Sequence, residues 1–144
     1  MPDEPIWLTE EQVIRINQRL VEATDEPHLL MHSGLLSSGM ARPKNRWAYG
    51  EQDVANLAGM LVLGIGMNHP FQQGNKRTAL TSAKVFLQFN GYTFVAPDSQ
   101  ELGALIERSI VGMIPEQRFL RAMRGCTIPT EEWRAFQTSK PEAE

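Results

Sequence analysis

Apolar residues along this 144-residue chain recur mainly three or four positions apart, the spacing that gathers them on one face of a helix. A capping box that starts at Thr9 predicts a first helix over about residues 10–23. Ser33 is suited to cap a second, short helix, and Pro43 is expected to end it because the residue before a proline avoids helical angles. Residues 42–53 are then expected to form an exposed connection.

The stretch from Val54 to Met67 is apolar around its whole circumference, which predicts a buried helix at the centre of the fold. Its glycines, at positions 59, 64 and 66, lower the helix propensity, so we expect neighbouring elements to pack closely against them. A second core helix with one apolar side follows from about residue 75 and is expected to end at Gly91.

The remaining chain continues the helical pattern after one interruption. Residues 92–97 can form a brief extended segment, and Asp98 predicts a capping box for the next helix. Pro115 predicts the start of a further helix that Gly125 ends, and Thr130 or a neighbour is expected to cap a last one. The fold class predicted by these patterns is all-α.

Composition limits what such a chain does. Its length predicts one compact domain, over residues 1–137, with a flexible tail at 138–144. Lys and Arg number 14 against 17 Asp and Glu, so the net charge of −3 disfavours direct nucleic-acid binding. Cys126 is the single cysteine, and no apolar run approaches the roughly 18 residues of a membrane span. The N-terminus lacks the order of a secretion signal, so a cytoplasmic protein without membrane contact is expected.

One stretch, "NHPFQQGNKRTAL" at residues 68–80, joins the two predicted core helices. His69 falls at the end of the first helix, and Gly74 with Asn75 opens the second, whose first N–H groups have no helical acceptor. Lys76 and Arg77 lie at this same helix start, where the helix dipole also favours anions. No Asp or Glu occurs between positions 53 and 98, so this segment is expected to be positive and to bind phosphate.

Each of these residues also fits a purely structural role. A lone histidine is often hydrogen-bonded within a fold, Lys and Arg are usually solvated, and Phe71 is expected to anchor the loop in the core. The stretch lacks the Gly-Lys-Ser/Thr triplet of a P-loop, and "GIGMNH" at residues 64–69 has His69 where the third glycine of a dinucleotide fingerprint belongs. His28, His32 and His69 make a weak metal-ligand set, because no acidic or thiol partner accompanies them.

The segment "HPFQQGNKRTAL" closely resembles the Fic/Doc superfamily signature, His-x-Phe-x-Asp/Glu-Gly/Ala-Asn-Gly/Lys-Arg. Upstream, "GLLSSGMARPKNRWAYGE" resembles the death-on-curing (Doc) toxin branch, and the likeness extends over roughly residues 8–125. The resemblance implies a compact helical bundle whose central helix ends at His69. It also implies a short β-hairpin flap that aligns a target peptide, and residues 42–51 are expected to form it.

The resemblance further implies the roles of the loop residues. His69 would be the general base that activates a protein hydroxyl, Gly74 and Asn75 would form the anion hollow, and Arg77 would neutralise phosphate charge. Lys76 stands where adenylylating members have glycine, which favours the Doc branch and transfer of the terminal phosphate of ATP. The protein would then be the toxin of a toxin–antitoxin pair, with a translation factor such as elongation factor Tu as target and a partner that folds on binding. The alternative is an adenylyltransferase of the Fic type.

Gln73 departs from the signature, because it replaces the carboxylate that holds Mg²⁺ in the family. Its amide oxygen brings no charge, so Mg²⁺ binding is expected to be weakened. The phosphates of ATP could hold enough metal, a distant carboxylate such as Glu51 or Asp53 could fold into the site, or the protein could be a catalytically weak nucleotide binder. The inhibitory-helix pattern of the family is absent, and Trp47 and Tyr49 are candidates for the antitoxin contact.

Overall fold

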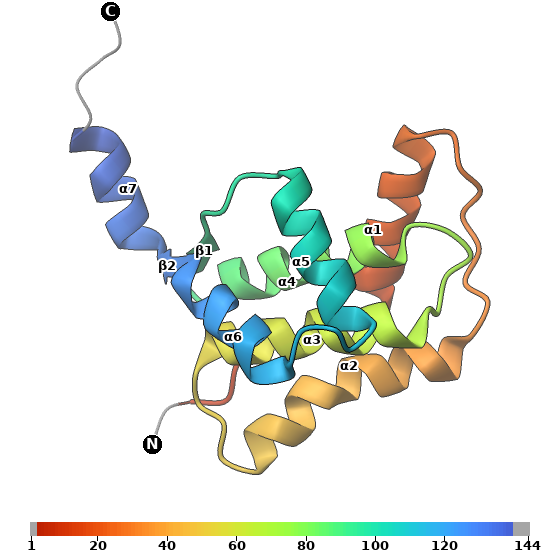
Figure 1. The fold of residues 1–144 in the computed structure, drawn as a ribbon, viewed down its shortest axis with the longest axis horizontal. Coiled ribbons are helices and arrows are strands. Elements are labelled where there is room, and N and C mark those ends of the chain that lie inside the picture. The colour runs from red at the N-terminus through yellow and green to blue at the C-terminus, as the bar shows by residue number, and fades with distance from the viewer. Residues whose placement is uncertain (1–2, 140–144) are drawn as a thin grey trace, which may run out of the picture.

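The structure is a computed structural model that describes residues 3–139 (Figure 1). It is all-α with one small antiparallel sheet, as the sequence predicts. The elements within these residues are α1 Glu10–Ala23, α2 Ser33–Ala48, α3 Val54–Asn68, α4 Asn75–Phe89, β1 Tyr92–Phe94, α5 Gln100–Ile110, α6 Glu116–Gly125, β2 Thr127–Pro129 and α7 Thr130–Ser139. None of the helices in this part of the chain is long and apolar enough to cross a membrane.

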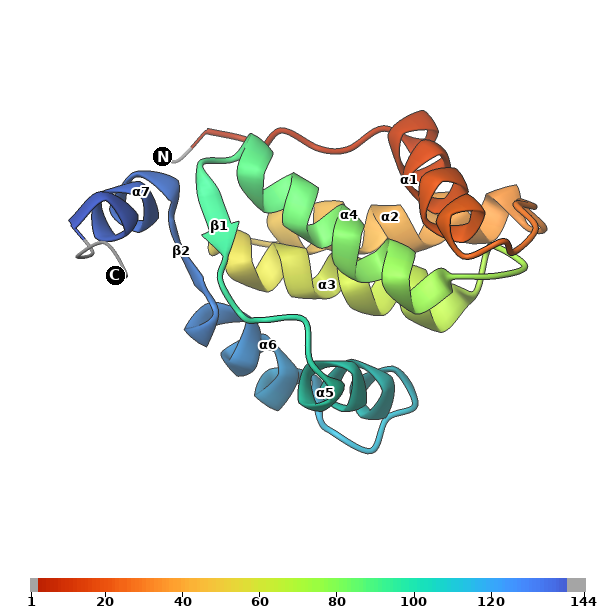
Figure 2. The ribbon, with the colours of Figure 1, turned by 90° about the horizontal axis from the view of Figure 1, so that it is seen from above.

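Helix α3 forms the centre of the molecule, and α2, α4, α5 and α6 pack around it (Figure 2). The glycines of α3 lie where its neighbours approach most closely, as predicted. A Cβ atom on Gly59 would lie 2.5 Å from the side chain of Leu120, and one on Gly66 would lie 2.4 Å from the side chain of Ile110. A Cβ atom on Gly64 would lie 2.1 Å from the carbonyl oxygen of Gly39 in α2, so the two backbones touch directly. The backbone contact requires glycine at position 64, whereas at positions 59 and 66 a Cβ atom would displace the end of a flexible side chain.

Helix α2 is longer than the sequence predicts, because Pro43 lies inside it and the helix continues to Ala48. Proline removes the N–H that would bond the carbonyl four residues earlier, and that carbonyl belongs to Gly39. The same carbonyl faces Gly64 of α3, and the ring of Pro43 is itself buried. Helix α2 thus continues through Pro43 at the place where it packs directly on α3. The expected exposed connection over 42–53 and β-hairpin flap over 42–51 are both wrong, since residues 42–48 are helical.

The extended segment predicted at 92–97 is present in part as β1, which pairs with β2 in the register Tyr92↔Pro129, Thr93↔Ile128 and Phe94↔Thr127. This sheet joins the end of α4 to the C-terminal elements. Helix α7 follows directly and projects from the body (Figure 1). It includes positions 138 and 139, so the predicted tail does not begin at 138, and residues 140–144 lie outside the described residues.

Of the predicted caps, Thr9 is confirmed, whereas those at Ser33 and Asp98 are wrong. Thr9 makes the expected capping box with Gln12. Ser33 is the first residue of α2, and His32 stands at the cap position without a side-chain bond. In α5, Ser99 accepts the capping bond from the backbone of Leu102, so Asp98 does not cap this helix. These shifts of one residue leave the order of the helices unchanged.

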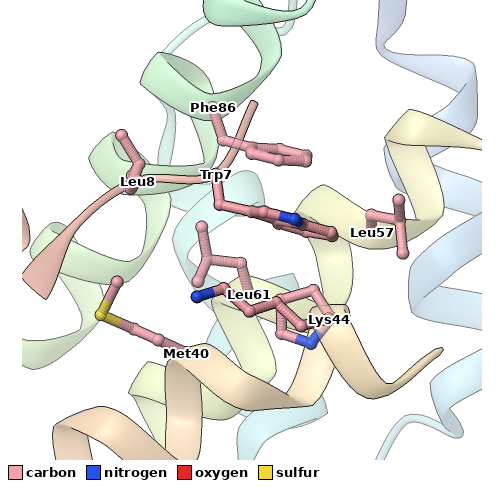
Figure 3. A pocket seen from close by; sticks show the side chains of 8 residues that line it. Trp7, Leu8, Met40, Lys44, Leu57, Leu61 and Phe86 are labelled. Carbon is pink, nitrogen blue, oxygen red and sulfur yellow. The ribbon is translucent and has the colours of Figure 1, made fainter. Parts of the chain in front are cut away.

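The N-terminal segment closes the core beside α2 and α4. Trp7 stacks on Phe86 with ring centroids 5.4 Å apart, and the two rings lie nearly parallel (Figure 3). The apolar cavity beneath Trp7 measures about 10 Å³, which is at most the space of one water molecule. It is a packing gap of the core and too small for a ligand.

Candidate functional site

The loop between α3 and α4, residues 69–74, is called the motif loop below; α3 and α4 lie side by side in Figure 2. His69 adopts the left-handed conformation with φ 47°, which ends α3, and its side chain is exposed. Gly74, with φ 77°, precedes the first residue of α4. A left-handed residue at each end lets the chain reverse direction within a short loop. The predicted helix boundaries at His69 and Gly74 are both confirmed.

The motif loop is fixed by side chains beneath it. Phe71 is only 2% exposed and anchors the loop in the core, as predicted. The Asn75 side chain bonds the Phe71 backbone twice: its Oδ1 accepts from the amide at 3.0 Å, and its Nδ2 donates to the carbonyl at 2.8 Å. Asn75 lines the site, and these two bonds hold the loop in shape through its side-chain amide.

A buried polar network supports the motif loop from α1. Asn17 is fully buried, and its Nδ2 donates to the Gln73 carbonyl at 2.8 Å and to the Thr78 hydroxyl at 3.0 Å. Its Oδ1 lies 2.8 Å from Nδ1 of His28. Sequence reasoning missed Asn17, although a signal was present: it sits four residues from both Val13 and Val21, on the buried face of α1. His28 therefore belongs to the scaffold, and residues 3–139 hold no cluster of three metal-ligating side chains.

The predicted site residues line one open depression, which is called the anion depression below. It has a volume of about 270 Å³ and is lined by His69 and by residues 72–77. Lys76 and Arg77 also line an adjoining hollow of about 420 Å³ between α4 and α5, with Leu80 and Ile106 among its apolar residues. The first residues of α4 line this region, and their N–H groups have no helical acceptor. An imidazole, a helix start and two cationic side chains thus share one surface.

The two cations are paired, which the charge pattern did not predict. Arg77 contacts the Glu26 carboxylate at 2.5 Å and the Thr24 hydroxyl at 3.1 Å. Lys76 lies 3.2 Å from Glu107 of α5. The expectation of an isolated positive segment is therefore wrong, because it considered only carboxylates nearby in sequence. All four charged side chains are about a third or more exposed, so solvent screens both pairs and each contributes little to stability.

The position of Glu26 follows from the way α1 ends. Asp25 adopts φ 56°, and the amide of Glu26 donates to the Val21 carbonyl at 2.8 Å, which is the Schellman arrangement. This turn brings Glu26 to Arg77. Hydrogen bonds from the Thr24 hydroxyl and then from Arg77 hold the pKa of Glu26 below its ordinary value. The carboxylate is therefore ionised at neutral pH and competes with other anions for Arg77.

The proposed replacements for the missing metal carboxylate do not reach the site. Asp53 caps the start of α3, whereas His69 ends it, and a helix of 15 residues is about 22 Å long. Glu51 bonds the backbone of Asp53 at that same far end. The residues that line the anion depression with Gln73 include no Asp or Glu, and Lys76 and Arg77 are paired with Glu107 and Glu26. Within residues 3–139, no group of three or more His, Cys, Asp or Glu side chains is placed to hold a metal ion.

A different extended segment lies where the flap was expected to act. Leu30 forms an antiparallel bridge with Phe71. The amides of Met31 and His32 donate to the Pro70 carbonyl at 2.9 and 3.1 Å, and the Gln72 amide donates to the Leu29 carbonyl at 2.9 Å. Residues 29–32 therefore run beside the motif loop. Trp47 and Tyr49 lie at the opposite end of α2, which has 16 residues and is about 24 Å long.

Comparison with known proteins agrees with this geometry. The model of the Fic/DOC family matches residues 7–87, which include the motif loop and more than half of the chain. No curated protein gives a significant match. The chain therefore belongs to the Fic/DOC family.

Proposed function

We propose that this protein is a Doc-like toxin that transfers the terminal phosphate of ATP to a hydroxyl group of a protein target. Members of the Fic/DOC family are typically transferases that modify proteins. The observation that carries the finer proposal is the anion depression, where exposed His69 lies beside Lys76, Arg77 and the start of α4. Lys76 in place of glycine favours phosphate transfer over transfer of AMP, because its side chain fills space and adds charge for the outer phosphate.

In the proposed reaction, His69 removes the proton of the acceptor hydroxyl. The hydroxyl oxygen then bonds to the γ-phosphorus, and the bond between that phosphorus and its bridging oxygen breaks, so ADP leaves. Histidine suits this step because its imidazole can accept a proton near neutral pH. Lys76, Arg77 and the first N–H groups of α4 stabilise charge on the phosphate oxygens.

ATP must displace Glu26 and Glu107 from the two cations before it binds. The ion pairs are partly solvated and individually weak, whereas a triphosphate carries several charges and contacts both cations together. The two carboxylates therefore lower nucleotide affinity without abolishing it. Because no Asp or Glu lines the anion depression, Mg²⁺ would be held by the phosphates of ATP, with the Gln73 amide oxygen as a neutral donor.

The Doc branch also suggests the biological setting. The proposed target is a translation factor, with elongation factor Tu as the first candidate, and the proposed antitoxin carries a segment that folds on binding. A catalytically weak, nucleotide-binding regulator is the second candidate function. Gln73 and the two paired cations favour it, because both reduce the attraction of the site for a metal-bound nucleotide.

Labelling experiments separate these functions. The purified protein is incubated with a cell extract and with ATP labelled at either the α or the γ phosphate. Protein label from γ supports the kinase, label from α supports an adenylyltransferase, and ATP binding without label supports the regulator. The Gln73→Glu variant, tested in parallel, is expected to transfer more label if the missing carboxylate limits metal binding.

A further inference from the structure

Positive charge is concentrated in two short segments of this acidic chain. Residues 42–46 and 108–124 together hold seven of the 14 Lys and Arg residues and a single carboxylate, Glu116. The rest of the chain has seven Lys and Arg against 16 Asp and Glu. Half of the cationic side chains therefore belong to strongly basic segments, although the protein as a whole is acidic.

The fold brings these two segments together. Helices α2 and α6 both pack on α3 (Figure 1). The guanidinium groups of Arg42 and Arg46 in α2 contact the two carboxylate oxygens of Glu116 in α6 at 3.2 and 2.5 Å. Arg118 and Arg121 follow Glu116 in the first two turns of α6 and are exposed. These four arginines, Arg42, Arg46, Arg118 and Arg121, are called the arginine strip below.

The charge of the arginine strip is not balanced within the described residues. Arg42 and Arg46 are four positions apart on α2, and Arg118 and Arg121 are three positions apart on α6. Each pair places two like charges side by side on a helix, which weakens the helix slightly. Of the carboxylates in residues 3–139, Glu116 alone pairs with the strip, and it contacts only the two arginines of α2. Folding of this domain therefore gives no reason for so many cations in one place.

We propose that the arginine strip binds an acidic segment of a partner protein. The contact already occurs once within the molecule, because Glu116 is a carboxylate held at both oxygens by two arginines. The planar guanidinium group matches the geometry of a carboxylate. Carboxylates of the partner contact Arg118 and Arg121 and share Arg42 and Arg46 with Glu116. The strip does not line the anion depression, so this proposal is independent of phosphate transfer.

The size of the arginine strip and the charge around it favour a short peptide over a nucleic acid. Helix α6 has 10 residues and is about 15 Å long, a distance that an extended peptide covers with about five residues. A DNA duplex carries one negative charge per roughly 1.7 Å and continues past the strip, where the acidic remainder of the chain repels it. Carboxylates begin directly at the end of α6, where Arg124 bonds Asn56 and the Asn56 amide bonds Glu51.

The test measures the fluorescence anisotropy of a labelled hexaglutamate peptide with the full chain, at low salt and without ATP. The strip variant is Arg118→Gln, Arg121→Gln. The matched control is Arg15→Gln, Arg19→Gln, which removes two exposed arginines from one face of α1 and changes the net charge equally. A hexaglutamine peptide and an oligothymidine with the charge of hexaglutamate are measured in parallel, and thermal melting checks that each variant is folded.

The wild type and the control are expected to bind hexaglutamate more tightly than the two other probes, and this binding should weaken as salt is added. The strip variant should bind it about tenfold more weakly, because two solvated ion pairs are removed. Glu116→Gln should bind it more tightly than the wild type, because Arg42 and Arg46 are then free for the peptide. Equal losses in the strip variant and the control, tighter binding of the oligothymidine, or no binding of hexaglutamate by the wild type would overturn the proposal.

Discussion

Replacing Asn17 with alanine should loosen the motif loop from beneath. Asn17 is fully buried and makes hydrogen bonds to the Gln73 carbonyl, the Thr78 hydroxyl and the His28 ring at 2.8, 3.0 and 2.8 Å. A net contribution of about 1 kcal/mol per bond gives a loss of about 3 kcal/mol, and burial of the unpaired partners raises it further. For a domain near this size, that loss lowers Tm by about 6–12 °C.

The assay is chemical and thermal denaturation of Asn17→Ala, with Gln18→Ala as the matched control. Gln18 is the next residue in α1, but it is exposed and bonds only Glu22 on the surface, so its loss should cost about 0.5 kcal/mol or less. Hydrogen exchange should also speed up at the amides of residues 72–78 in Asn17→Ala. A loss of stability below 1 kcal/mol, or unchanged exchange in this segment, would refute the role assigned to Asn17.

Three further predictions concern the ion pairs and the helix contacts. Glu26→Gln should raise ATP affinity in calorimetry, because the carboxylate that competes for Arg77 is gone; equal or weaker binding would contradict this. The pKa of Glu26 in the folded protein is lower than its ordinary value of 4.5. The hydrogen bonds of this carboxylate therefore stabilise the fold fully above pH 4.5, and the stabilisation is lost as the pH falls through the lowered pKa. The stability difference between wild type and Glu26→Gln, followed by urea denaturation against pH, should therefore shrink in acid. Gly64→Ala should cost at least 2 kcal/mol or so because its Cβ would meet the Gly39 backbone, whereas Gly34→Ala, with open space around it, should be neutral or stabilising.

The sequence predicts the parts of the site that depend on local chemistry. His69 ends α3 and Gly74 precedes α4, and both boundaries are determined by residues close to them in sequence, namely Pro70, Gly74 and the apolar positions of the two helices. The burial of Phe71 follows in the same way from its size and its position between two core helices. Such features are readable because neighbouring residues determine them.

What the sequence does not reveal depends on contacts between distant segments. Pro43 should end α2 by local rules, yet the helix continues to Ala48 and packs on α3 through the contact of Gly39 with Gly64. The positive charge of Lys76 and Arg77 is likewise offset by carboxylates that are distant in sequence. Glu26 lies 51 residues before Arg77, and Glu107 lies 31 residues after Lys76. Tertiary packing overrides local propensity in the first case and sequence-local charge in the second.

The most direct test of the proposed chemistry compares wild type with His69→Ala in the transfer of γ-labelled phosphate to proteins of a cell extract. Removing a general base should lower the transfer rate by about 10²–10⁴-fold. ATP affinity should stay close to that of the wild type, because Lys76, Arg77 and the start of α4 remain in place. Equal labelling by the two proteins, or label that comes only from the α phosphate, would contradict phosphate transfer by His69.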